Sequence, residues 1–216
     1  MTSRERLLSA VRGGTVDKKP KICWPISGTD SDVQLTAGQE QKVHLVEVAN
    51  PFGIAMMRSL DLNALLKIDP KAGNDVLTEL CEESTRSIDT AFASGADGVI
   101  YTLYGARARH CTPMQYGGFY LEKDREILSR ISEAFFNMVF VVGDEDVYLD
   151  FVSDLPAHAL AWDITSSRIS VEDVRLMRSG ALACDDPAAD ILLEPGTSLL
   201  SQKLEDNVRP ERSYAV

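Results

Sequence analysis

The stretch DVLTELCEESTRSIDTAFASGADGVIYTL, which runs from Asp75 to Leu103, contains the pattern that decides the fold class. Its first part places apolar and small residues at the 3.6-residue period of one helix face, and Gly95 ends that helix. Its last part, Gly98 to Leu103, is apolar at almost every position, as is typical of a strand buried on both faces. The stretch therefore predicts a long amphipathic helix that leads directly into a buried strand.

The same alternation of amphipathic and apolar segments continues on both sides of this stretch. Further strands are expected at residues 21–26, 43–48, 138–142, 159–162, 181–184 and 191–193. Further helices are expected after the capping box of Thr2 and Glu5, at 54–60, 121–136 and 147–155, after Ser170, and at 198–212. Apolar strands separated by helices lie parallel, so a (β/α) barrel or a doubly wound sheet is expected. About seven strands are counted, whereas a complete eightfold barrel typically takes about 250 residues.

Composition limits the domain count and the classes of partner. A length of 216 residues with 44% hydrophobic content supports one substantial core, so residues 1–216 are expected to form a single domain. The net charge of -11 argues against nucleic acid and anionic membranes as partners. No apolar run approaches the roughly 20 residues that span a bilayer, and the first residues lack the apolar core of a signal peptide. A cytoplasmic location is therefore expected.

Several segments resemble successive blocks of one enzyme superfamily. They are SRERLLSAVRGGTVDKKPKICWP (Ser3 to Pro25), Gly95 to Gly105, Phe140 to Asp163 and Ala189 to Thr197. In this order they are similar to the uroporphyrinogen decarboxylase superfamily, which includes the cobalamin-dependent methyltransferases. The resemblance separates the two fold options, because it implies a (β/α)8 TIM barrel.

The chain is short for that family, and the shortage can be located. Only Gly28 to Lys42 separates the first predicted strand from the segment that resembles the family around Val46 to Leu60. The resemblance therefore implies a barrel shortened by about one β/α unit. Such a loss leaves a strand edge that a helix or a partner usually covers. We accordingly expect a two-fold homodimer with its interface between Ser27 and Leu60.

The residues that carry the family's chemistry are missing at the matching positions. The decarboxylases bind substrate carboxylates with an arginine-bearing loop, whereas Pro25 to Asp30 contains no arginine. The zinc ligands of the methyltransferase branch match Phe140, Val142 and Thr197, and phenylalanine and valine cannot coordinate a metal. The four cysteines have no CxxC spacing, which argues against a zinc ribbon or a disulfide framework. No metal is therefore expected.

Polar side chains nevertheless follow the ends of several predicted strands, where the active sites of barrel enzymes lie. The candidate catalytic residues are Asp144, Asp163 and His110, and the candidate ligand-binding residues are Tyr104, Arg107, Trp162, Asp185 and Glu194. Each has a structural alternative. An aspartate after a strand is a favoured helix N-cap, His110 suits either acid–base chemistry or a solvated loop, and Trp162 suits either the core or ligand stacking.

Two functional hypotheses follow from these residues. In the first, the chain binds a small molecule, such as a tetrapyrrole or a corrinoid, at the carboxyl-terminal face of the barrel and has no cofactor of its own. In the second, it is a lyase or a methyl transfer enzyme that uses the acidic residues and His110 without a metal. The fold alone does not separate them.

Overall fold

The structure is a computed structural model that describes residues 1–23, 33–34 and 42–194. The predicted helix at 198–212, the matched position Thr197, and residues 27–32 and 35–41 of the predicted dimer interface lie outside these residues. Within them, no helix combines the length and the apolar character needed to cross a membrane.

Eight parallel strands form one curled sheet. They are β1 (Lys21–Cys23), β2 (Val33–Gln34), β3 (Val43–Ala49), β4 (Gly98–Leu103), β5 (Met138–Val141), β6 (Ala159–Trp162), β7 (Ala181–Cys184) and β8 (Ile191–Glu194). Their order is β1-β8-β7-β6-β5-β4-β3-β2, and each hydrogen-bonded pair is parallel. The predicted parallel α/β architecture is therefore confirmed. The sheet is barrel-like but not a closed barrel, because no pairing in the described residues joins β1 to β2.

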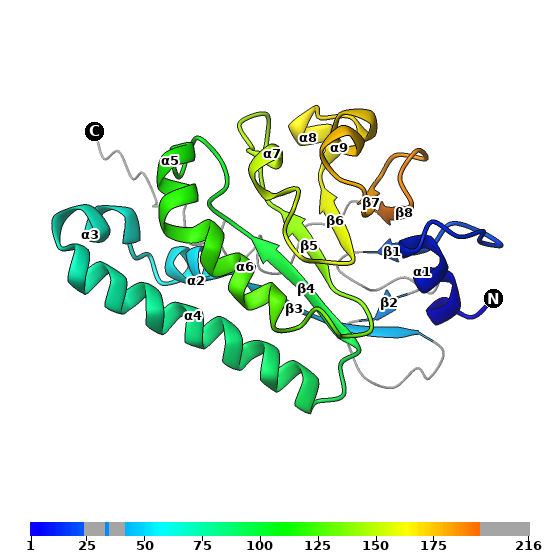
Figure 1. The fold of residues 1–216 in the computed structure, drawn as a ribbon, viewed down its shortest axis with the longest axis horizontal. Coiled ribbons are helices and arrows are strands. Elements are labelled where there is room, and N and C mark those ends of the chain that lie inside the picture. Colours follow the sequence, from blue (N-terminus) through cyan, green and yellow to red (C-terminus); the bar gives the residue numbers. More distant parts are fainter. Residues whose placement is uncertain (24–32, 35–41, 195–216) are drawn as a thin grey trace, which may run out of the picture.

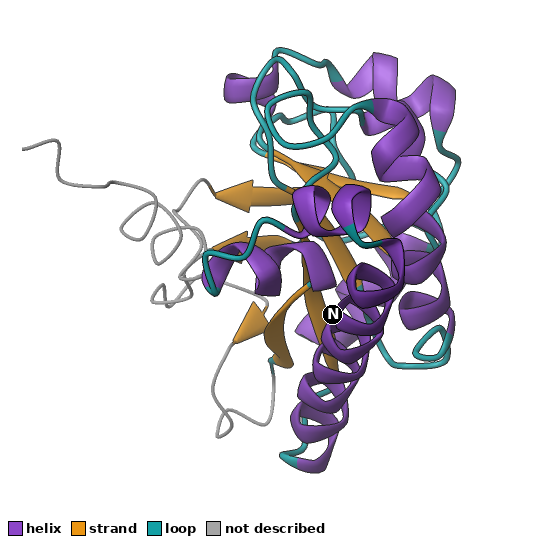
Figure 2. Ribbon diagram, turned by 90° about the vertical axis from the view of Figure 1, so that its left-hand side faces the viewer, coloured by secondary structure: helices purple, strands orange, loops and turns teal. Residues whose placement is uncertain are grey.

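Helices cover the outer face of this sheet (Figures 1 and 2). They are α2 (Pro51–Met57), α3 (Leu62–Ile68), α4 (Pro70–Ala93), α5 (Pro113–Gln115), the π-helix η1 (Tyr116–Leu121), α6 (Glu122–Ser129), α7 (Leu149–Val152), α8 (Ile164–Ser167) and α9 (Val171–Met177). The expected shortening by about one β/α unit does not remove a strand from the sheet, since the two-residue strand β2 lies between β1 and β3 in the sequence. Part of the shortening lies in the helical layer instead: residues 185–190 join β7 to β8 without a helix.

Side-chain caps explain most helix starts. Asp69 accepts a hydrogen bond from the Ala72 amide, so α4 begins at Pro70 and is longer than its apolar period predicts. The predicted capping box is confirmed at α1 (Ser3–Val11), where Thr2 and Glu5 bond to each other's amides. The helix predicted at 121–136 is divided instead between η1 and α6 and ends at Ser129.

The core has two layers, one on each face of the sheet. The outer layer packs strand residues against the helices. The inner layer contains alternate strand residues, many of them small, and includes Leu45, Ile100, Ala161, Ala183 and Leu193. Leu7 and Ala10 of α1 join this inner layer beside residues at strand starts, such as Val43 and Met138, so α1 closes the amino-terminal end of the barrel.

Candidate functional site

Two loops meet at the carboxyl ends of neighbouring strands. Residues 104–112 follow β4 and residues 142–148 follow β5, toward the top of Figure 1. The Ala108 amide donates to the Asp146 carbonyl at 3.0 Å, and the Tyr148 amide donates to the Ala106 carbonyl at 2.8 Å. An antiparallel bridge between Arg107 and Val147 completes this contact. The loops therefore support each other as a short two-stranded unit.

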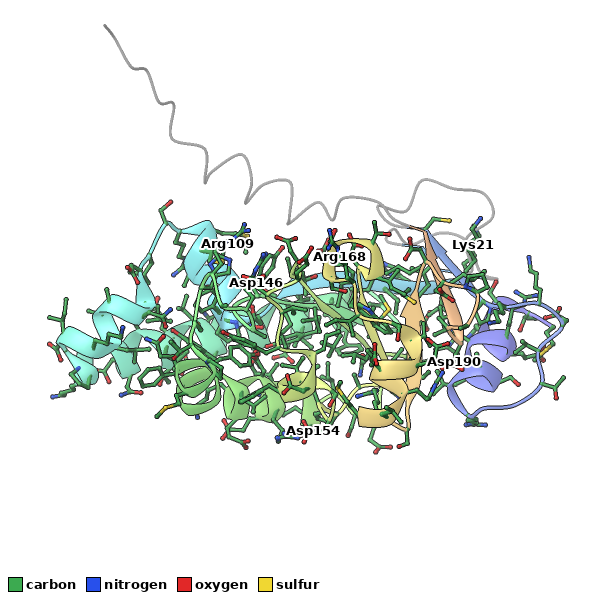
Figure 3. All side chains as sticks on the ribbon, turned by 90° about the horizontal axis from the view of Figure 1, so that it is seen from above. Lys21, Arg109, Asp146, Asp154, Arg168 and Asp190 are labelled. Carbon is green, nitrogen blue, oxygen red and sulfur yellow. The ribbon has the colours of Figure 1, made fainter. Side chains whose placement is uncertain are left out.

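Arg107 is the centre of this unit and is only 6% exposed. Its Nε donates to Asp146 Oδ1 at 2.9 Å, and its Nη2 lies 2.5 Å from Asp144 Oδ2. Arg109 joins the same cluster, because its amide donates to Asp146 Oδ2 at 2.9 Å and its Nη2 lies 3.3 Å from Asp144 Oδ2 (Figure 3). The two carboxylates are thus paired with two guanidinium groups.

The charges in this cluster shift each other's pKa values. Burial acts to raise the pKa of Asp146, but hydrogen bonds from Arg107 and from the Arg109 amide lower it below its ordinary value. Burial acts to lower the pKa of Arg107, but its hydrogen bonds to Asp146 and Asp144 raise this pKa above its ordinary value. Asp146 and Arg107 therefore stay charged near neutral pH and are poorly suited to carry protons.

Asp163, a candidate catalytic residue, has the contacts of a helix N-cap. Its Oδ1 accepts from the Ser166 amide at 2.9 Å, and its Oδ2 accepts from the Ser166 hydroxyl at 2.7 Å. These bonds satisfy the first turn of α8. The capping interpretation describes all of these contacts.

Replacing Asp163 with alanine is expected to lower the free energy of unfolding by about 1 kcal/mol through loss of this cap. Asparagine keeps an oxygen acceptor, so Asp163→Asn is expected to stay close to the wild type in urea denaturation. If Asp163→Asn had this expected stability but lost a measured activity, Asp163 would have a chemical role in addition to capping α8.

His110 lies beside a cavity of about 360 Å³ between α3 and α5. The cavity is lined mainly by polar side chains, namely Asp61, Asn63, Lys67, His110 and Gln115, with Ile68 at its edge. Asn63 Nδ2 donates to the His110 carbonyl at 2.9 Å, which fixes the loop against α3. Burial, and then the positive charges of Arg107 and Arg109, lower the pKa of His110. Its imidazole is therefore neutral at neutral pH.

Two candidate ligand-binding side chains lie in the core. Trp162 is 1% exposed within the outer core layer, and its Nε1 donates to the Ile169 carbonyl at 3.0 Å. Tyr104 is 3% exposed and belongs to the same layer. The core interpretation of Trp162 is the one that its surroundings support.

The remaining two candidates stand at other strand ends. Asp185 follows β7, is exposed, and accepts a long hydrogen bond of 3.5 Å from the Thr165 hydroxyl. Glu194 is the last residue of β8, and its side chain lies outside the described part of the chain. The structure thus unites Arg107, Asp144 and His110 around one pair of loops and places Asp163 and Asp185 on neighbouring ones.

Glu47 was missed by the sequence analysis. It alternates with Val43 and Leu45 on the inner face of β3, and its Oε1 accepts from the hydroxyl of the fully buried Thr102 at 2.9 Å. One signal was present, since a single carboxylate interrupts the apolar strand VHLVEVA. A carboxylate inside a barrel near the strand ends belongs with the candidate site residues.

No group of three or more His, Cys, Asp or Glu side chains in the described residues is arranged to hold a metal ion. Phe140 packs against the inner core layer, where the zinc methyltransferases would carry a ligand. The absence of bound zinc stays a prediction.

The fold and the polar strand ends define an α/β protein with a barrel-like parallel sheet. No family model and no curated protein matches the chain. Among solved structures, it is similar to a methyltransferase from Methanosarcina mazei, with a TM-score of 0.60 and 13% sequence identity over 79% of this chain and 59% of that one. The chain thus spans about three-fifths of that protein's length. At this identity the likeness is one of fold, and it agrees with the TIM-barrel-like architecture.

Proposed function

We propose that this chain binds a small molecule in the cavity between α3, α5 and the loop that follows β4, without the decarboxylase or zinc methyl transfer chemistry. The observation that carries the proposal is the cavity between α3 and α5, where His110 of the loop 104–112 contributes to the lining and the Arg107 cluster braces that loop. A site braced by ion pairs to a buried arginine is preorganised for a ligand. The volume of about 360 Å³ falls at the low end for ligand pockets, which typically measure about 300–1,000 Å³.

The lining indicates the class of ligand. Lys67 supplies a positive charge, and Gln115 supplies amide hydrogens, since its oxygen already accepts from the Thr112 amide. Asn63 is bonded to the His110 carbonyl and the Tyr120 hydroxyl, so it shapes the site without being free to bind a ligand. Ile68, with 83% of its side chain exposed, offers an apolar surface at the rim. The site therefore suits a ligand with carboxylate or amide oxygens on an apolar body. A small acid fits whole, while a tetrapyrrole or corrinoid would insert one peripheral group and lay its ring edge on Ile68.

One observation favours the alternative of an active enzyme. The neutral imidazole of His110 in a cavity is a form that can accept a proton. The contacts of the two candidate catalytic aspartates argue against an active enzyme, because Asp144 is paired with two arginines and Asp163 caps α8. Binding without turnover is therefore the function that the contacts support best.

The proposal is tested by titrating the purified protein with hydroxocobalamin, coproporphyrin and a set of small carboxylic acids. Calorimetry and visible absorption measure the binding. We expect saturable binding of at least one probe, and Lys67→Met should weaken it about tenfold through loss of a charge-assisted contact. Arg12→Met removes an exposed charge beyond the other end of the barrel and should leave the affinity unchanged. If none of the probes binds saturably, the proposal is refuted.

A further inference from the structure

A buried carboxylate is linked through one side chain, Asn50, to the base of the loop 104–112. Asp124 of α6 is 1% exposed, in the outer layer between the sheet and the helices. Its Oδ1 accepts from the Tyr101 hydroxyl at 2.7 Å, and its Oδ2 accepts from the Tyr116 hydroxyl at 2.7 Å and from Asn50 Nδ2 at 3.4 Å. Donors from β4, η1 and the start of α2 thus converge on one side chain.

Asn50 connects this carboxylate to the site loop. Its Oδ1 accepts from the amides of Gly53 and Tyr104 at 2.9 and 3.1 Å, which fixes the orientation of its amide group. Its Nδ2 donates both to the Tyr104 carbonyl at 3.0 Å and to Asp124. Tyr104 is the first residue of the loop 104–112, which carries Arg107 and His110. The side chain of Asn50 therefore clamps the loop at its base.

We propose that Asp124 is a positioning residue for the loop 104–112, which it holds through Asn50 when its carboxylate is ionised and releases when it is protonated. The ionised form matches its surroundings, since all three neighbours offer it a hydrogen. Protonation places a hydrogen on one carboxyl oxygen, so the tyrosine on that oxygen must accept instead of donate, and the neutral group is a weaker acceptor than the carboxylate. The bond from Asn50, which has no such reversal available and is the longest at 3.4 Å, is the one that weakens.

The charge state of Asp124 changes in an accessible pH range. Burial raises its pKa to about 6, against the opposing effect of hydrogen bonds from Tyr116, Tyr101 and Asn50. The titratable groups that face it from the elements packed around it are Tyr101 of β4, Tyr116 of η1 and Cys81 of α4. Burial raises the pKa of each of these three groups, so they remain neutral while Asp124 titrates.

Linkage gives two opposite effects of pH. Because the hydrogen bond from Asn50 lowers the pKa of Asp124, ionised Asp124 strengthens that bond in return, and the loop is held better above about pH 6. Global stability responds in the other direction. The folded-state pKa lies above the unfolded value, so this group's contribution to stability is full at low pH and is lost as pH rises through about 6.

Hydrogen exchange of the free protein tests the loop directly, through the amides of Gly53 and Tyr104 that donate to Asn50. In the wild type we expect their protection, corrected for intrinsic exchange, to rise at least about fivefold between about pH 5 and about pH 7.5. Asp124→Asn resembles the protonated acid and should show low protection at both values. The control Asp89→Asn removes an exposed charge from α4 and should follow the wild type. Equal and pH-independent protection in all three proteins would overturn the proposal.

Two further measurements separate the possible failures. If Asp124→Asn does not fold, Tyr116→Phe is used in its place. This substitution removes a hydrogen bond that lowers the pKa of Asp124, so the midpoint of loop protection should move to higher pH. An unmoved midpoint would overturn the proposal. The effect on ligand affinity rests on the proposed function. We expect any probe that binds to do so more tightly above about pH 6 in the wild type but not in Asp124→Asn. A loop response without binding of any probe would support the positioning role and refute the proposed function.

Discussion

Replacing Arg107 with methionine is expected to lower the free energy of unfolding by about 3 kcal/mol, because the carboxylates of Asp144 and Asp146 then lose their main positively charged partner. The side chain is 8% exposed, while Asp146 and Asp144 are 28% and 51% exposed, so solvent relieves part of the cost. The loops after β4 and β5 should also separate, since Arg107 bonds to both aspartates. Urea denaturation measures the first effect, and exchange of the Ala108 amide measures the second.

Arg109 offers a matched control for this experiment. It pairs with the same Asp144, but its side chain is 65% exposed, so Arg109→Met should change stability by no more than about 0.5 kcal/mol. Equal effects of the two substitutions would show that burial of Arg107 does not distinguish the two ion pairs. The loop unit would then depend on its backbone hydrogen bonds alone.

Replacing Trp162 with alanine should cost more, about 3–5 kcal/mol, because a fully buried indole leaves a large cavity in the outer core layer. Trp162→Phe keeps most of the volume and removes the donor to the Ile169 carbonyl, so a loss of about 1–2 kcal/mol is expected. Thermal or urea denaturation gives both values.

The Trp162→Phe variant also decides between the core and the stacking interpretations of Trp162. A core residue far from the ligand should leave probe affinity unchanged in Trp162→Phe, measured well below the unfolding transition. Loss of probe binding with unaltered stability would contradict the core interpretation and return Trp162 to the ligand-binding residues.

Local patterns in the sequence determined most elements of the fold. The segment from Asp75 to Leu103 predicted α4 and β4, because a helix face and a strand buried on both sides each produce an apolar pattern that is visible within a short stretch of sequence. Thr2 and Glu5 predicted the start of α1 for the same reason, since a cap is an interaction over three residues. The parallel sheet followed from strands that are apolar on both faces.

The sequence also predicted a site at the strand ends, but it could not show what each polar residue contacts there. Asp144 and Asp163 look alike in sequence, since each follows a strand. In the structure, one pairs with Arg107 and Arg109 from the loop after another strand, and the other bonds to Ser166 within its own turn. Only the second contact is local enough to be predicted from spacing.

Tertiary structure alone decided the remaining features. Asp124 reads as one of several charges on the amphipathic helix α6, and its burial depends on Tyr101, Tyr116 and Asn50 arriving from other elements. Local periods record which face of an element is buried, whereas the partner of a buried polar group is set by contacts between residues that are distant along the chain.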